Sequence, residues 1–213
     1  MKIVLFGASG TIGSRIVREA LARGHDVTAV VRDPTGVPAG GEHFAAQRGD
    51  VTNAADVTRV ARGAEAIVSA VAPTGGQPLS MLTDAARALI AGARSARVKR
   101  LVVVGGAGSL EVPEGGRVMD RASFPDAWKP IAQAHTDALQ VYRTEAGGLD
   151  WTYASPAAVI EPGARTGRYR TGEDRLLVDD QGHSHISAED FAVAIVDELE
   201  RPAHVGRRFT VAD

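Results

Sequence analysis

The chain has 213 residues, of which 44% are hydrophobic and 23% charged, and its formal net charge is −2. These values are ordinary for one globular domain spanning residues 1–213, and they exclude a strongly basic face for nucleic acid. The absence of cysteine excludes disulfides, thiolate catalysis and cysteine-ligated metals. No segment is apolar for long enough to suggest a signal peptide or a membrane span, so we expect a cytoplasmic protein without membrane contact.

The chain opens on a pattern typical of phosphate-binding loops. An apolar strand at residues 3–6 is followed by Gly7, Gly10 and Gly13 at GxxGxxG spacing. Gly7 lets the chain turn sharply, Gly10 lets the backbone approach a pyrophosphate, and Gly13 lets the next helix pack closely on the sheet. Strand, glycine-rich turn and helix in this order predict a dinucleotide-binding loop, whereas the alternative is a tight turn without a ligand.

The helix after this loop begins with free backbone N–H groups, which favour an anion, and Ser9 and Thr11 add hydroxyls there. Gly24 is expected to end the helix, and residues 26–31 form a second strand. The apolar positions that repeat at helical spacing are Ile12, Ile16, Val17, Ala20 and Leu21.

The residue after the second strand distinguishes the two nicotinamide dinucleotides. An acidic residue at that position would bind the ribose 2′-hydroxyl of NAD, but this chain has Arg32, whose guanidinium can pair with a 2′-phosphate. The pattern predicts NADP(H) as the preferred cofactor and leaves NAD(H) as a second one. Two alternatives stay open: Arg32 is a solvated surface charge, or the neighbouring Asp33 faces the ribose.

The rest of the chain alternates between strand and helix patterns, with a surface loop at residues 34–41. Further strands are expected at residues 43–48, 64–71, 100–104, 151–154 and 207–211, with short ones at 167–169 and 176–178. Helices are expected after a cap at Thr52, at residues 79–96 and 131–146, and after a cap at Ser187 followed by Asp190. This alternation predicts an α/β, doubly wound parallel sheet in the order 3-2-1-4-5-6, with a C-terminal edge strand and helices on both faces.

Ligands of such sheets bind beyond the carboxyl ends of the strands. Two long irregular segments, residues 105–130 and 156–185, follow the fifth and sixth strands at that edge. Because long loops in compact domains are usually functional, we expect these two to wall a substrate pocket, the alternative being surface excursions. The larger side chains that they offer are Met119, Phe124, Trp128 and Tyr169.

Several stretches resemble a known group of proteins: GASGTIG, the Arg-Asp pair after the second strand, GDVTN, RLVVVGGAGSL and GLDWTYASPAAVIEPGARTGRY. They are similar to the atypical short-chain dehydrogenase/reductases, and more narrowly to an NAD(P)H-binding group that includes NADH-flavin reductase-like proteins and lies near NmrA-like proteins and biliverdin-IXβ/flavin reductases. The resemblance covers essentially the whole chain. It implies a single Rossmann domain that binds NADP(H) or NAD(H).

The resemblance also implies positions in the cofactor site. Asp50 and Val51 would lie beside the adenine, and Ala70, Val71 and Ala72 near the nicotinamide ribose. With the residues of the loop and the second strand, the expected cofactor-binding set is Gly7, Ser9, Gly10, Thr11, Ile12, Gly13, Arg32, Asp50, Val51, Ala70, Val71 and Ala72.

One departure from the typical short-chain dehydrogenases bears on mechanism. Those enzymes carry a Tyr-x-x-x-Lys pair on the helix before the sixth strand, but here Ile131 and His135 fall near the two positions, and Tyr142 is followed four residues later by Ala146. This argues against a standard alcohol or ketone dehydrogenase. Hydride transfer to a flavin, quinone or similar conjugated acceptor needs mainly positioning, because the acceptor delocalises charge and solvent can supply the proton.

Two side chains are candidates for contact with such an acceptor. Ser109 could hydrogen-bond it, the alternative being a turn hydroxyl that bonds its own backbone. His135 could donate to a substrate oxygen or to the cofactor ribose, the alternative being a structural histidine. Trp128 and Lys129 could border the pocket, or Trp128 could simply pack.

A metal site is not expected. His183 and His185 alternate as on one face of a strand, with Asp179 and Asp180 nearby, but no third ligand of fixed spacing is evident.

Two function classes remain. The first is an NAD(P)H-dependent reductase of a small conjugated acceptor. The second is a cofactor sensor of the NmrA type that binds the dinucleotide and a protein partner without turnover. The expected partner is a small-molecule acceptor, and the expected assembly is a monomer or homodimer.

Overall fold

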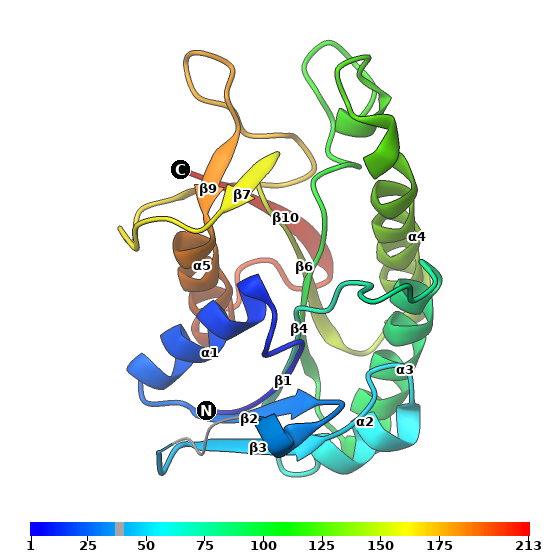
Figure 1. Cartoon of the computed structure of the whole chain (residues 1–213), viewed down its shortest axis with the longest axis vertical. Coiled ribbons are helices and arrows are strands. Elements are labelled where there is room, and N and C mark those ends of the chain that lie inside the picture. Colours follow the sequence, from blue (N-terminus) through cyan, green and yellow to red (C-terminus); the bar gives the residue numbers. More distant parts are fainter. Residues whose placement is uncertain (37–40) are drawn as a thin grey trace.

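The computed structural model describes residues 1–36 and 41–213 (Figure 1). Of the predicted surface loop at residues 34–41, Pro34–Gly36 form a short 3-10 turn, and residues 37–40 lie outside the described residues.

The core of the fold is an eight-stranded sheet in the order β3-β2-β1-β4-β5-β6-β10-β8. This confirms the predicted 3-2-1-4-5-6 order, and the pairs from β3 to β10 are all parallel. The strands are β1 (Lys2–Phe6), β2 (Asp26–Val31), β3 (Phe44–Arg48), β4 (Ala66–Ser69), β5 (Arg100–Val104), β6 (Asp150–Ser155), β8 (Arg170–Gly172) and β10 (Arg207–Ala212), with a separate pair of β7 (Val159–Glu161) and β9 (His185–Ser187).

The far end of the sheet differs from the prediction. The C-terminal strand β10 is not an edge strand, because it pairs with β6 on one side and with the antiparallel β8 on the other. The short strands predicted at residues 167–169 and 176–178 are also wrong. The observed β8 is set by its register with β10, in which Gly172 pairs with Thr210, and such a long-range pairing leaves no local pattern.

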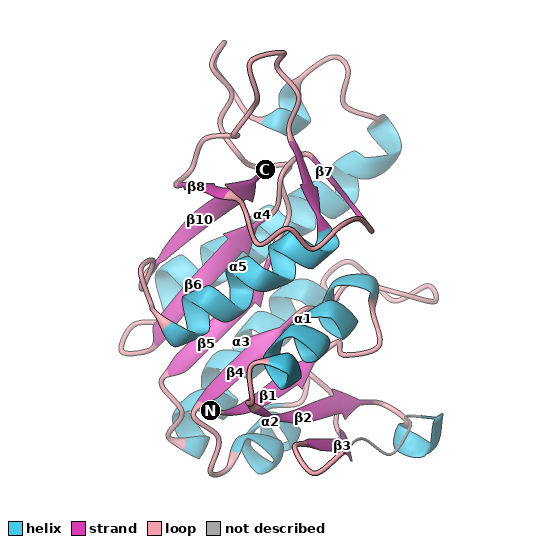
Figure 2. Ribbon diagram, turned by 90° about the vertical axis from the view of Figure 1, so that its left-hand side faces the viewer, coloured by secondary structure: helices cyan, strands magenta, loops and turns pink. Residues whose placement is uncertain are grey.

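Five helices cover the two faces of the sheet in the described part of the chain. Figure 1 shows α1 and α5 on one face and α2, α3 and α4 on the other, and Figure 2 looks onto the α1 and α5 side. Their bounds are α1 (Thr11–Ala22), α2 (Ala54–Ala61), α3 (Met81–Ala96), α4 (Lys129–Glu145) and α5 (Ala188–Glu200). None of the described helices could cross a membrane by length and apolar character.

The strand β1 shows why both faces need cover. Its buried side chains alternate between two hydrophobic clusters: Ile3 and Leu5 pack under α1 and α5, and Val4 and Phe6 pack on the opposite side. A strand with apolar side chains on both faces is stable only between two helical layers.

The helix ends follow local chemistry. Gly24, with a φ of +77°, follows the end of α1 as predicted. Ser187 caps α5, since its hydroxyl accepts the N–H of Asp190 at 3.0 Å. The predicted cap at Thr52 is wrong: the side chain of Asn53 accepts the first free N–H groups of α2, while Thr52 donates to Asp50.

The two long irregular segments pack against each other. The N–H of Glu111 donates to the carbonyl of Asp174, and the N–H of Leu176 donates back to that of Glu111, both at 2.8 Å. Their apolar side chains share one buried cluster. The buried Arg208 of β10 hydrogen-bonds Ser109 of one segment and Asp174 of the other. The cluster contains Leu110, Val112, Val118 and Leu176.

Candidate functional site: a cleft with an anion-binding end and an apolar end

The glycine loop brings β1, β4 and α1 into direct backbone contact. A Cβ at Gly7 would lie 2.4 Å from the carbonyl oxygen of Ala70, and Gly7 has a φ of +83°. A Cβ at Gly13 would lie 2.0 Å from the carbonyl oxygen of Gly7. A larger residue at Gly7 would therefore push the loop away from the end of β4, and one at Gly13 would push α1 away from the end of β1.

Gly10 differs from these two glycines. A Cβ there would meet only the carbonyl oxygen of Gly7, at the ordinary contact distance of 3.4 Å, so internal packing does not require glycine. Gly10 is the N-cap of α1, and no side chain caps the free N–H groups of that helix end. The bare helix N-terminus with an open backbone fits a pyrophosphate group.

A cavity of about 550 Å³ opens from this helix end along the carboxyl edge of the sheet. Its volume is within the range of about 300–1,000 Å³ usual for ligand sites. Every residue of the expected cofactor set lines it except Gly13, which packs beneath. Lining residues that the sequence reasoning missed are Phe6, Val30, Val31, Gly49, Thr74, Gln77, Met81, Val104, Gly105, Pro156 and Ile160.

Some of these missed residues had a usable signal. Gly49 immediately precedes Asp50, and a Cβ on it would lie 2.8 Å from the side chain of Val30. Thr74 and Gln77 follow β4, and Pro156 and Ile160 follow β6, so the rule that ligands lie beyond strand ends indicates all four.

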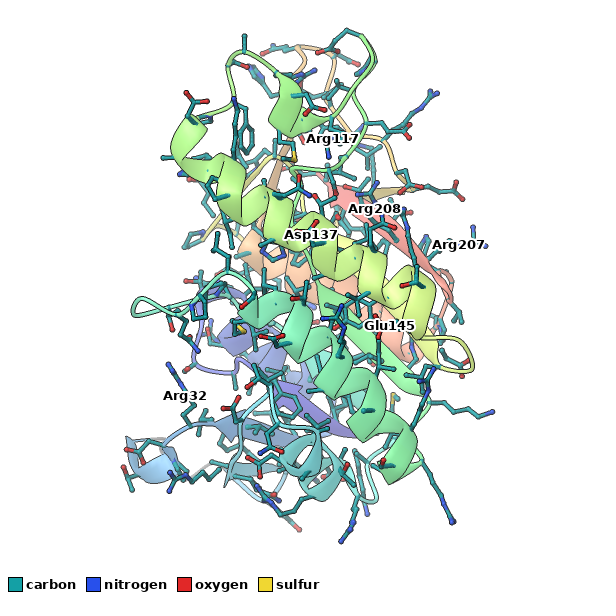
Figure 3. The ribbon with its side chains drawn as sticks, turned by 90° about the vertical axis from the view of Figure 1, so that its right-hand side faces the viewer. Arg32, Arg117, Asp137, Glu145, Arg207 and Arg208 are labelled. Carbon is teal, nitrogen blue, oxygen red and sulfur yellow. The ribbon has the colours of Figure 1, made fainter. Side chains whose placement is uncertain are left out.

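Arg32 lies at one end of the cavity. It is exposed, and its Nη2 donates to the hydroxyl of Thr74 at 3.4 Å. Figure 3 shows Arg32 well apart from Arg208 of β10 at the other side of the sheet. Asp33 does not line the cavity; its carboxylate accepts the N–H and hydroxyl of Thr35, which lowers its pKa. The geometry therefore favours Arg32 over Asp33 as the side chain that meets a ribose.

Asp50 is held in a tight local turn. Its carboxylate accepts both the N–H and the hydroxyl of Thr52, at 2.9 and 2.8 Å, and its own N–H donates to Asp56. These bonds hold Asp50 and Val51 in place at the wall of the cavity.

The other end of the cavity is mostly apolar. Val104 ends β5 and Gly105 follows it, Pro156 and Ile160 follow β6, and His135 reaches it from α4. His135 is the one titratable side chain among these lining residues, and it is partly buried. Burial lowers its pKa to about 4, so the ring is neutral near pH 7.

The structure places Ser109 elsewhere. Its hydroxyl oxygen accepts a hydrogen bond from Nη1 of the buried Arg208 at 2.8 Å, and Ser109 is not among the lining residues. Trp128 is 59% exposed and packs edge-on against Phe124, and Lys129 pairs with Asp126. Neither Trp128 nor Lys129 lines the cavity.

Tyr142 belongs to the hydrophobic core. It is 2% exposed, its ring lies beside those of Trp151 and Tyr153, and burial raises the pKa of its hydroxyl above the ordinary value. Tyr142 does not line the cavity of about 550 Å³, and that it takes no part in proton transfer stays a prediction.

His183 and His185 each lie beside carboxylates. His183 lies 3.4 Å from Asp179, and His185 lies 2.6 Å from Asp213 and 3.5 Å from Glu161. Over residues 1–36 and 41–213, no three histidine or carboxylate side chains are grouped so as to hold a metal ion.

The depressed pKa of His135 predicts a pH effect on stability. In the unfolded chain this histidine takes up a proton below about pH 6.5, whereas in the folded chain it stays neutral down to about pH 4. The contribution of His135 to the free energy of unfolding is thus fully present above pH 6.5 and is lost as the pH falls toward 4. Thermal unfolding should show the wild type losing Tm relative to His135→Asn across this window. A constant difference in Tm from pH 7 to 4 would contradict the depressed pKa.

Comparisons with known proteins agree with this geometry. A family model described as NAD(P)H-binding matches residues 7–202. The uncharacterized protein YwnB of Bacillus subtilis (strain 168) is 41% identical over 216 residues, covering 99% of this chain and 98% of YwnB.

Solved structures share the whole fold. A "putative exported protein" from Burkholderia pseudomallei is 48% identical with a TM-score of 0.90, covering 100% of both chains. A "putative epimerase" from Bacteroides thetaiotaomicron is 42% identical with a TM-score of 0.90, covering 99% of this chain and 96% of that one. A "putative NADH-flavin reductase" from Streptococcus pneumoniae TIGR4 is 32% identical with a TM-score of 0.86, covering 100% and 99%. The chain therefore belongs to the NAD(P)H-binding family of Rossmann-fold proteins related to the atypical short-chain dehydrogenase/reductases.

Proposed function

We propose that the protein is an NADPH-preferring reductase that passes hydride to a small, neutral, conjugated acceptor such as a flavin or quinone. The observation that carries this proposal is the pairing of two unlike ends in one cavity. One end offers a bare helix N-terminus and Arg32, and the other offers apolar walls with a single neutral imidazole.

The residues of the first end fit a phosphorylated dinucleotide. The backbone N–H groups at the start of α1 suit the pyrophosphate, Asp50 and Val51 line the wall that would meet the adenine, and Arg32 suits a 2′-phosphate. When bound, NADPH supplies the hydride for the reaction. The protein's part is to hold donor and acceptor in close, oriented contact, which alone can account for several kcal/mol of barrier reduction.

The second end suits an acceptor that needs no acid from the protein. His135 is neutral and gives up no proton as an imidazolium near pH 7, and the hydroxyl of Tyr142 is buried in the core. A conjugated ring system spreads the incoming charge and can take its proton from solvent. The "putative NADH-flavin reductase" of Streptococcus pneumoniae, which shares the fold over the whole chain, supports a flavin-like acceptor.

A panel of acceptors tests the proposed reaction. NADPH oxidation, followed by absorbance, should proceed with FMN, FAD or a small quinone, and should not proceed with simple ketones. The reverse assay, NADP⁺ reduction, should give no signal with secondary alcohols. If NADPH binds but no acceptor supports oxidation above background, the reductase is rejected in favour of a cofactor sensor.

Removal of the Arg32 guanidinium should change cofactor preference. Its contact with the 2′-phosphate is charge-assisted and worth about 1.5–3 kcal/mol, so Arg32→Ala should weaken NADPH binding roughly ten- to a hundredfold and leave NADH binding nearly unchanged. Titration calorimetry with both cofactors measures this. Arg18→Ala is the matched control, because Arg18 is an exposed arginine of α1 that does not line the cavity. Equal affinities of the wild type for the two cofactors would contradict the preference.

A side chain at Gly10 should block the pyrophosphate without unfolding the protein. Gly10→Val places methyl groups where the phosphates would lie, while the nearest protein atom stays at ordinary contact distance. We expect loss of NADPH binding with a change in Tm of only a few degrees. Gly147→Val is the control, because a Cβ there meets nothing within 4 Å and Gly147 is outside the cavity lining. Retained affinity in Gly10→Val would show that the phosphates bind elsewhere.

A further inference from the structure

The GGAGSL segment after β5 makes room for two side chains from other elements. A Cβ at Gly105 would lie 1.9 Å from the ring of Tyr153, which comes from β6. A Cβ at Gly106 would lie 3.2 Å from the ring of His135, which comes from α4. Because both positions lack a side chain, Tyr153 and His135 meet directly beneath the segment.

The same segment is anchored from below. Arg208 of β10 is 4% exposed, donates to the hydroxyl oxygen of Ser109 at 2.8 Å, and binds the carboxylate of Asp174 through Nε at 2.8 Å. Ser109 thus holds the segment against β10. Its hydroxyl is already bound by Arg208 and needs no contact with the acceptor.

The hydroxyl of Tyr153 has one proton and two nearby acceptors on His135. It lies 3.0 Å from the carbonyl oxygen of His135 and 3.4 Å from the ring atom Nδ1. The shorter contact takes the proton, so the tyrosine oxygen presents a lone pair to Nδ1. If Nδ1 is unprotonated, its lone pair repels the lone pair of the tyrosine oxygen. If Nδ1 is protonated, its N–H donates a hydrogen bond to that oxygen.

The protonation state of the ring then follows. His135 is neutral near pH 7 because burial lowers its pKa, and a neutral imidazole carries only one ring proton. With that proton on Nδ1 and directed to Tyr153, Nε2 has none. Nε2, which has no hydrogen-bond partner in the described part of the chain, is therefore an acceptor on a residue that lines the cavity.

We infer that Tyr153 is a positioning residue that holds His135 in its Nδ1–H tautomer, so that Nε2 accepts a hydrogen bond from an O–H or N–H group of the ligand at the apolar end of the cavity. This rests on the proposed function, because the ligand is one of the two reactants. It also reverses the role expected from the sequence, in which His135 donates. The donor belongs either to the nicotinamide side of the cofactor or to the acceptor.

The tautomer can be measured without turnover. In the full-length protein, the ¹⁵N chemical shifts of the imidazole nitrogens show which one is protonated, and His135→Gln identifies the signals of His135. We expect Nδ1–H in the wild type and a mixture of tautomers in Tyr153→Phe. Tyr142→Phe is the matched control and should match the wild type, because Tyr142 is equally buried but makes no hydrogen bond to His135 in the described structure. An Nε2–H form in the wild type, or no change in Tyr153→Phe, would overturn the inference.

Binding and kinetics identify the source of the donor. If the acceptor supplies it, the wild type should favour lumiflavin over N3-methyl-lumiflavin, which lacks the ring N–H, by about three- to tenfold in kcat/KM. His135→Leu and Tyr153→Phe should lose that preference. If the cofactor supplies the donor, both variants should instead weaken NADPH binding by about three- to tenfold. This loss should be the same whichever acceptor is used.

The double variant separates positioning from general packing. Tyr153→Phe combined with His135→Leu should be no worse than His135→Leu alone, since the tyrosine acts through the histidine. Additive losses, or two single variants that change neither NADPH binding nor acceptor preference, would overturn the inference. If none of the acceptors supports NADPH oxidation by the wild type, the proposed function is refuted. The ¹⁵N measurement would still decide the tautomer of His135.

Discussion

The architecture of this protein depends on the close approach of α1 to the end of β1. The helix starts so near the strand that a single Cβ at Gly13 would lie 2.0 Å from the carbonyl oxygen of Gly7. This approach directs the free N–H groups of α1 along the carboxyl edge of the sheet rather than into solvent. Gly7 also lies against Ala70 just beyond β4, so the glycine loop and the segment after β4 form adjoining walls of the cavity.

A second contact of the same kind shapes the opposite end of the cavity. Gly105 and Gly106 follow β5 as the glycine loop follows β1, and the space that they leave is filled by Tyr153 and His135. Gly10 of the glycine loop leaves open space at the cavity, while Gly105 and Gly106 leave room for the protein's own side chains. The result is a cleft with Arg32 and the N-terminus of α1 at the β2 end and a mostly apolar surface at the β5 end.

The parts of the fold that were predictable are those with local causes. The glycine loop, the continuous apolar strand β1 and the helix end at Gly24 are each specified by a few neighbouring residues. The position of Arg32 beside the cavity could be predicted because it comes directly after β2. No local sequence pattern indicates that β10 lies inside the sheet, because its second partner, β8, comes from about forty residues earlier in the chain. The cap at Asn53 shows a finer limit: Thr52 and Asn53 are adjacent and both suitable, and the bonds of Thr52 to Asp50 decide between them.

The candidate site divides in the same way. Eleven of the twelve residues expected to bind the cofactor line the cavity, because their motif is contiguous or follows a strand end. The two expected to act in catalysis depended on distant partners. Ser109 is bound by Arg208, 99 residues away, and His135 is oriented by Tyr153 of a different element. Neither partner is identifiable from sequence pattern, since Tyr153 looks like any buried strand residue.

A crystal structure of the protein with NADP⁺ would show where each part of the cofactor binds. We expect the pyrophosphate on the backbone N–H groups of Thr11 and Ile12, the 2′-phosphate within hydrogen-bonding distance of Arg32, and the nicotinamide at the apolar end beside Val104 and His135. A pyrophosphate bound away from the start of α1, or a nicotinamide ring that lies outside the apolar end, would contradict it.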